Sequence, residues 1–229
     1  MASISIPPEA PAGDDRFRPV AGTLNTLGLI ALLALLAYLG LISAGKAGGQ
    51  GLGNHALLYV PTLIAEWLLF LYVWLGIRAR RVSLRELIGP RWTSVQQISV
   101  NILVAAAFWL GSALVNVVTG YLLRTGNMTE RLKFMAPRGA GEMATWVLLS
   151  ITAGICEETI FRGYLQRQFI AWTRNSAFGV ALSAILFGAG HIYQGWRQAT
   201  VIGIYGAMFG TLAVWRKDLR PGMMAHAFQ

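Results

Sequence analysis

The feature that most constrains this chain is a series of apolar runs of about twenty residues each, separated by polar or charged segments. The first three runs cover about residues 22–43, 55–77 and 96–118. An apolar helix of that length spans the hydrocarbon core of a bilayer. Within that core, only helices and closed barrels satisfy their backbone polar groups internally. The runs therefore predict an all-α, polytopic transmembrane helix bundle.

The second half of the chain continues the pattern after a polar segment at 119–141. A fourth helix is expected from Glu142 to about residue 172, a fifth over about 176–192 and a sixth over about 198–215. A seventh begins at "PGMMAHAFQ", where proline suits the first turn of a helix. About seven spans are therefore visible, and the last is expected to be truncated, with an incomplete C-terminus.

Two other segments carry local signals. Residues 1–20 are rich in Pro, Ala and acidic residues, which predicts a flexible tail in front of a membrane domain at 21–229. In "LRELIGPRW", the spacing of Leu84, Leu87 and Ile88 predicts a short amphipathic helix lying on the membrane surface.

Charge supports the membrane assignment and gives it an orientation. Only 13% of the residues are charged, against about 25% in an average soluble domain. The net charge of +9 comes from basic residues in short segments beside apolar runs, which argues against a nucleic-acid partner. If the N-terminus is cytoplasmic, 13 of the 19 basic residues fall on the cytoplasmic side. This bias predicts that the N-terminus is cytoplasmic. The composition and the short loops are those expected of a multi-pass protein of a bacterial inner membrane.

A few ionisable side chains fall within the apolar runs. A charge at the centre of a membrane helix costs about 2.5–3.5 kcal/mol on insertion scales, so such residues are usually paired or functional. They are Glu66, Glu157, Glu158, His191 and His226, with Arg162 near a membrane boundary. Glu66 has three open alternatives: an ion pair with His226, an ion pair with Arg162, or a position facing a water-filled cavity. The single cysteine, Cys156, is expected to be a small packing residue.

The stretch "EETIFR" places two acids and an arginine on one helix. Glu158 and Arg162 are four residues apart, so they share a face and can pair. Glu157 lies about 100° round the helix from Glu158, so both acids cannot face Arg162. We therefore expect Glu157 to point into the bundle, where it could act as a general base. The alternative is a structural ion-pair cluster.

Two histidines follow on later helices. In "FGAGHIY", Phe187 and His191 share a face, while Gly188 and Gly190 leave room for close approach. His226 falls one to two turns into the last helix. A lone histidine near a helix end can be a hydrogen-bonded interfacial residue. Together with Glu157, however, the two histidines could converge on one cavity.

Two chemistries fit that convergence. In the first, Glu157 and His191 activate water, and His226 stabilises an oxyanion formed on a carbonyl. In the second, the same glutamate and histidines bind zinc. The residue spacing does not separate the two, although the helical H-E-x-x-H motif of zinc proteases is absent.

These motifs resemble the CPBP family of CAAX-processing and bacteriocin-processing intramembrane proteases, also described as Rce1-like or Abi. "EETIFR" matches the family motif E-E-x-x-x-R, and "FGAGH" matches F-x-x-x-H. His226 matches the first position of the third motif, H-x-x-x-N, whose last position would follow Gln229. The resemblance places a catalytic core at about 142–229.

The resemblance implies an all-helical enzyme that cleaves a peptide bond of a membrane-associated peptide or protein. Glu157 and His191 become the pair that activates water, and His226 becomes an oxyanion donor. Three further motif residues become supporting residues: Glu158, Arg162 and Phe187. We favour a metal-free glutamate mechanism without a cofactor. Zinc held by Glu157, His191 and His226 is the alternative.

Two other functions stay open at this point. One is a non-catalytic membrane protein on the same scaffold that binds peptides or confers bacteriocin immunity. The other is a proton-coupled transporter that uses Glu66 and the glutamate pair as a relay. The absence of an inverted repeat counts against the transporter.

Overall fold

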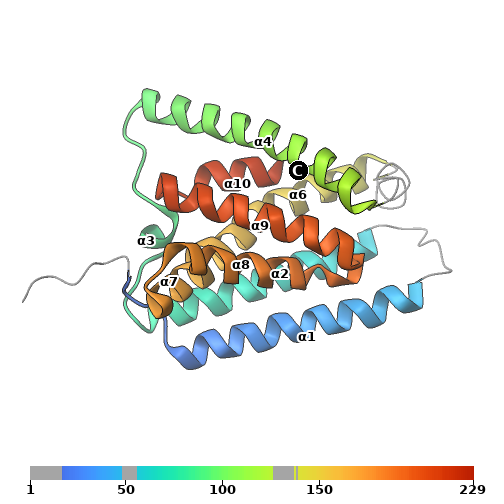
Figure 1. Cartoon of the computed structure of the whole chain (residues 1–229), viewed down its shortest axis with the longest axis horizontal. Coiled ribbons are helices and arrows are strands. Elements are labelled where there is room, and N and C mark those ends of the chain that lie inside the picture. Colours follow the sequence, from blue (N-terminus) through green and yellow to red (C-terminus); the bar gives the residue numbers. More distant parts are fainter. Residues whose placement is uncertain (1–16, 48–55, 126–136, 138) are drawn as a thin grey trace, which may run out of the picture.

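The computed structural model describes residues 17–47, 56–125, 137 and 139–229. In these residues all regular structure is helical, as the sequence predicts (Figure 1). The elements are α1 (Thr23–Ala47), α2 (Ala56–Arg78), α3 (Leu84–Ile88), α4 (Val95–Leu123), α6 (Ala140–Glu157), η2 (Glu158–Gln166), α7 (Arg167–Thr173), α8 (Ser176–Gly190), η3 (Ile192–Gln194), α9 (Trp196–Arg216) and α10 (Arg220–Ala227).

Five of the helical segments are long and apolar enough to cross a membrane. They are Thr23–Ser43, Tyr59–Arg78, Val95–Leu123, Ala140–Thr173 and Trp196–Arg216. The other two predicted spans, α8 and α10, are shorter, with 15 and 8 residues. At 1.5 Å per residue, a helix the length of α8 is shorter than the roughly 30 Å hydrocarbon core. The chain is a multi-pass membrane bundle.

The third predicted span is longer than the sequence suggested. The apolar pattern pointed to an end near residue 118, but α4 continues to Leu123. It stops where Arg124 adopts a left-handed conformation with φ 51°, a common way for a helix to end.

The predicted N-terminal tail falls mostly on residues 1–16, which lie outside the described residues. The structure differs from the predicted tail boundary at Val20, which is buried. The side chain of Gln168 accepts from the backbone N–H of Val20 (3.0 Å) and donates to the carbonyl of Ala21 (3.2 Å). These bonds attach the residues just before α1 to the core.

The short helix predicted around Leu84 is present as α3, with a different environment from the expected one. Leu87 is buried and Leu84 packs against the same hydrophobic cluster, so the apolar face of α3 packs against the bundle. Ser83 caps the helix: its hydroxyl accepts from the Glu86 N–H, and the Glu86 carboxylate accepts from the Ser83 N–H. This reciprocal arrangement is a capping box.

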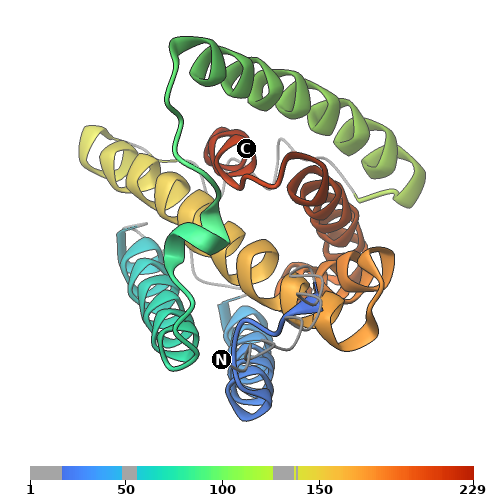
Figure 2. The ribbon, with the colours of Figure 1, turned by 90° about the vertical axis from the view of Figure 1, so that its left-hand side faces the viewer.

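The continuous segment formed by α6 and η2 runs through the middle of the bundle (Figure 2). On one side α10 packs against α6 and also against α4. On the other side lie α1 and α2, and α8 pairs closely with α9. The central segment is therefore covered by protein, while α4 and α1 form opposite flanks (Figure 1).

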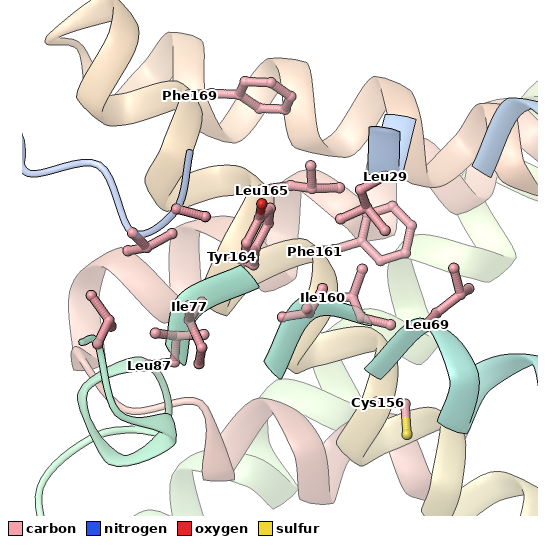
Figure 3. Close-up of a cluster of buried hydrophobic side chains, with 14 of the residues drawn as sticks. Leu29, Leu69, Ile77, Leu87, Cys156, Ile160, Phe161, Tyr164, Leu165 and Phe169 are labelled. Carbon is pink, nitrogen blue, oxygen red and sulfur yellow. The ribbon is translucent and has the colours of Figure 1, made fainter. Parts of the chain in front are cut away.

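The main hydrophobic core forms where η2 meets α1 and α2 (Figure 3). Ile160, Tyr164 and Leu165 are at most 1% exposed and pack among side chains such as Leu29 and Ile77. The Tyr164 hydroxyl lies 3.2 Å from the Thr26 hydroxyl, which provides a partner for a buried polar group. This packing fixes one face of η2 and directs its other face toward α8, α9 and α10.

Candidate active site

The motif "EETIFR" lies at a change in helix type. The sequence predicts an α-helix here, whereas residues 158–166 form a π-helix, with wider turns. Hydrogen bonds between this segment and neighbouring helices support it. The Ser183 hydroxyl donates to the Phe161 carbonyl (2.8 Å), and the Gln166 side chain donates to the Gly210 carbonyl (3.0 Å). Such departures from α-geometry are frequent at functional sites.

Glu158 and Arg162 form the predicted ion pair. Arg162 Nη1 lies 3.0 Å from Glu158 Oε1, and the two side chains are 2% or less exposed. Arg162 also donates to the Gly206 carbonyl (3.3 Å). Its guanidinium lies 4.4 Å from the ring centre of Phe187 and 5.2 Å from that of Phe209. The buried arginine is thus held by charge, hydrogen bonding and aromatic faces.

His226 lies between the two glutamates. Its Nδ1 is 2.9 Å from Glu158 Oε1, and its Nε2 is 3.5 Å from Glu157 Oε2. As the helical spacing predicts, Arg162 pairs with Glu158. The two acids nevertheless share one neighbour, because α10 inserts an imidazole whose two nitrogens reach one acid each.

The two sides of this imidazole differ in accessibility. Glu158 is almost fully buried, whereas Glu157 and His226 are 18% and 15% exposed. Since a carboxylate can only accept, the short contact to Glu158 places a proton on Nδ1 of His226. The accessible edge of the cluster is therefore Nε2 of His226 together with the Glu157 carboxylate.

Close packing at Gly154 sets the position of His226. A Cβ at Gly154 would lie 2.6 Å from the Met223 carbonyl oxygen and 3.2 Å from the Ala227 nitrogen. Only glycine allows α10 to approach α6 this closely. Because Gly154 precedes Glu157 by one turn, the contact fixes the distance between the glutamates and the histidine.

The start of α10 has its own anchor, which the sequence analysis missed. The buried carboxylate of Asp218 accepts from Trp92 Nε1 (2.7 Å) and from the Arg220 N–H (3.0 Å). The Leu219 N–H donates to the Ile88 carbonyl at 2.8 Å. An acid three residues before "PG" was the available signal, since such residues often cap helices. Its partner Trp92 could not be identified without the fold.

His191 is placed next to this cluster without touching either glutamate. It follows the last residue of α8, and its Nδ1 lies 2.9 Å from the Phe187 carbonyl. The ring of Phe187 is 5.0 Å from that of His191 and 6.2 Å from that of His226. The predicted motif residues thus gather around Phe187, and of the two motif histidines only His226 has a described contact with the acids.

The two glycines before His191 behave differently. A Cβ at Gly188 would lie 2.6 Å from the Ala199 carbonyl oxygen, so the predicted close helix approach is confirmed there. At Gly190 a Cβ would meet nothing within 4 Å.

The zinc alternative can be tested on the donor geometry. Among the described residues, no three His, Cys, Asp or Glu side chains come close enough together to hold a metal ion. Nδ1 of His226 faces Glu158 and Nδ1 of His191 faces a backbone carbonyl, which leaves Nε2 of each ring as the nitrogen that could bind a metal. In this structure Glu157, His191 and His226 are not grouped closely enough to share one ion.

Comparison with known proteins agrees with the motifs. Residues 139–229 match the family model described as type II CAAX prenyl endopeptidase Rce1-like. No curated protein and no solved structure gives a significant match to the chain. The matched segment contains α6, η2 and α8 to α10, which are the elements that build the cluster around His226. The resemblance to the CPBP proteases is thereby confirmed: residues 139–229 of this multi-pass membrane chain match the Rce1-like endopeptidase family.

Proposed function

We propose that this protein is an intramembrane endopeptidase that hydrolyses a peptide bond with water activated by Glu157. The observation that carries the proposal is the accessible edge formed by Glu157 and His226, backed by the buried pair of Glu158 and Arg162. The match of this segment to an endopeptidase family supports the same reaction class.

In the proposed reaction, Glu157 takes a proton from a water molecule as that water attacks the substrate carbonyl. The same carboxyl can then pass the proton to the leaving amine. His191 is the second group assigned to the water. Since it lies beyond contact distance of Glu157, it would act from the opposite side of a water molecule held between them.

His226 is assigned to the negative charge that develops on the carbonyl oxygen. Its Nδ1 proton is bound by Glu158, so donation to the oxyanion falls to Nε2, which requires the doubly protonated ring. Glu157 and Glu158 favour that cation. A fixed donor in a water-poor site stabilises a developing oxyanion more strongly than water does. Glu158, Arg162 and Phe187 hold the ring in place.

The substrate class follows from the surroundings. The site lies within a membrane bundle, so a membrane-associated peptide or protein is the substrate we propose. We further propose a metal-free reaction in a bacterial inner membrane, with the N-terminus cytoplasmic.

The test is cleavage by the purified full-length protein in liposomes that contain a membrane-anchored reporter peptide. Glu157→Gln should lower the rate by about 100-fold or more, in line with the loss of a general base. Glu86→Gln makes the same chemical change on the exposed surface of α3 and should retain the wild-type rate. Cleavage that survives Glu157→Gln would refute the mechanism. Binding of the peptide without cleavage by the wild type would support the non-catalytic alternative.

A second experiment, with a chelator, tests whether cleavage needs a metal ion. Activity should persist in chelator, and the active protein should contain less than one zinc per chain. Loss of cleavage in chelator, with recovery on adding zinc, would replace the glutamate mechanism with a metal-dependent one.

A further inference from the structure

A second aromatic ring faces the cluster around His226, and it comes from α9. Phe209 lies outside the three motifs, yet its ring contacts the same two side chains as the motif residue Phe187. We propose that Phe209 is a positioning residue, whose aromatic face holds Arg162 and His226 as cations. The role in catalysis rests on the proposed function of His226, while the interaction with the cations can be tested without it.

Phe209 lies close to both basic side chains of the site. The guanidinium carbon of Arg162 is 5.2 Å from the centre of the Phe209 ring and 4.4 Å from that of Phe187. The imidazole of His226 is 5.3 Å from the Phe209 ring, with 36° between the planes, and 6.2 Å from the Phe187 ring, with 90° between the planes. A cation within about 6 Å of a ring centre is attracted by the negative face of the ring. Phe209 is therefore the nearer ring to His226 and the more nearly parallel one.

Neighbouring helices hold the Phe209 ring in place. The side chain is 1% exposed, and Phe108 of α4 packs edge-on against it, with 4.8 Å between the ring centres. A Cβ at Gly222 of α10 would lie 3.5 Å from the ring, so α10 packs on it directly. One turn earlier on α9, the Gly206 carbonyl accepts from Arg162 at 3.3 Å. Since residues three apart share a helix face, α9 offers the same guanidinium a hydrogen-bond acceptor and an aromatic ring.

The aromatic face matters because the negative charge beside the two cations changes during the proposed reaction. Arg162 and His226 both contact the same oxygen of Glu158, and Glu157 lies 3.5 Å from His226. When Glu157 takes a proton from water, Glu158 is the only ionised carboxyl among the described contacts of the two cations. A ring face attracts a cation without accepting its proton, so Phe209 stabilises both cations throughout this step.

Hydrophobic packing is the other role open to Phe209, which forms a small cluster with Ala105 and Ala225. The two roles differ in their dependence on the charge distribution of the ring. Fluorine atoms withdraw electrons from the ring and weaken its negative face, while they change its size little. A ring that only fills space should therefore tolerate fluorine, whereas a ring that holds cations should not.

Site-specific incorporation of fluorinated phenylalanine into the full-length protein tests the interaction. With a monofluorinated and then a trifluorinated ring at Phe209, the Tm in detergent micelles should fall stepwise, by about 2 °C or more for the trifluorinated ring. The matched control is Phe169, a buried ring whose neighbouring ring, Trp172, carries no charge. The same replacements there should lower the Tm by less than half as much. Equal changes at the two positions, or no change at Phe209, would overturn the proposal.

Peptide cleavage tests the positioning role separately. Because Phe209 is buried away from the substrate, the trifluorinated ring should lower kcat by about threefold or more and leave KM nearly unchanged. Phe209→Leu keeps an apolar side chain without an aromatic face, and it should lower kcat at least as much. A kcat that the fluorinated rings leave unchanged, despite a lower Tm, would overturn the role in catalysis. If even the wild type cleaves nothing, the proposed function fails, and the unfolding series still decides whether Phe209 holds the cations.

Discussion

The central segment η2 and the flanking helix α4 use polar and apolar residues in opposite ways. All nine residues of η2 are buried, including Glu158, Arg162 and Gln166. In α4 the apolar side chains are outside: Leu110 is 62% exposed and Val117 is 71% exposed. Lipid tails are as apolar as leucine, so burying leucine against protein brings little benefit. The comparison indicates that specific polar contacts and close packing hold this bundle together.

The few buried polar residues of α4 agree with that view. The Asn101 side chain accepts from Arg216 Nη2 (3.1 Å), and the Ser112 carbonyl accepts from the Tyr205 hydroxyl (2.9 Å). These bonds join α4 to α9, at the positions where α4 faces protein. The helix that carries no motif is attached through these bonds and through Ala105 and Phe108, which pack in a small cluster with Phe209, whereas every residue of η2 is buried.

The largest expected effect comes from removing the buried cation of η2. Arg162→Ala removes the arginine partner of the buried Glu158 and leaves it only His226, which should destabilise the protein by about 3 kcal/mol. Arg78→Ala removes an arginine that is exposed beside Trp74 and should change stability by less than about 0.5 kcal/mol. Unfolding of both variants in mixed detergent micelles measures the difference. Equal losses in the two would show that burial in η2 does not determine the cost.

This comparison also shows why the sequence predicted some features and missed others. Hydropathy located α1, α2, α4, α6 and α9, because a span must be apolar whatever it contacts. The pairing of Glu158 with Arg162 followed from helical spacing alone. Such features depend on local sequence or on the solvent, and both can be read from the chain.

The missed features depend on contacts between distant segments. The insertion of His226 between both acids requires α10 to lie on Gly154 of α6, a contact that helical spacing does not encode. The π-helix depends on partners such as Ser183, which bonds to it from α8. The Asp218 anchor likewise needs Trp92, which lies in another loop. Only the assembled fold brings these residues together.

The next largest expected effect is on membrane integration, and it comes from a substitution on the outward face of α4. Leu110→Arg places a charge near the middle of that span, on a side chain that faces outward. A charge facing lipid should cost about 2.5–3.5 kcal/mol on insertion scales and lower the membrane-integrated fraction. Leu110→Phe should integrate normally. Carbonate extraction of membranes measures both. Full integration of the arginine variant would indicate that this face of α4 meets protein or water.

A smaller difference in stability is expected between alanine substitutions of two glycines, one in α6 and one in α4. Gly154→Ala forces α10 away from α6 and should cost about 1–3 kcal/mol by overpacking, with a clear loss of peptide cleavage. Gly111→Ala on α4 meets nothing within 4 Å and should stabilise the helix by up to about 1 kcal/mol. Thermal unfolding and cleavage assays on both variants test this contrast. Normal cleavage by Gly154→Ala would mean that the α6–α10 distance is not critical.

The smallest effect concerns a polar contact outside the membrane. Bonds from the Ser83 backbone and hydroxyl hold the pKa of Glu86 below its ordinary value. The ionised Glu86 therefore stabilises the fold above that ordinary pKa, and this contribution is lost as the pH falls through the lowered value. Because Glu86 is exposed, Glu86→Gln should cost less than about 0.5 kcal/mol at pH 7 and still less in acid. Denaturation of both proteins at pH 7 and pH 3 measures the difference. A cost comparable to that of Arg162→Ala would show that exposed polar contacts stabilise this protein as strongly as the buried contacts of η2 do.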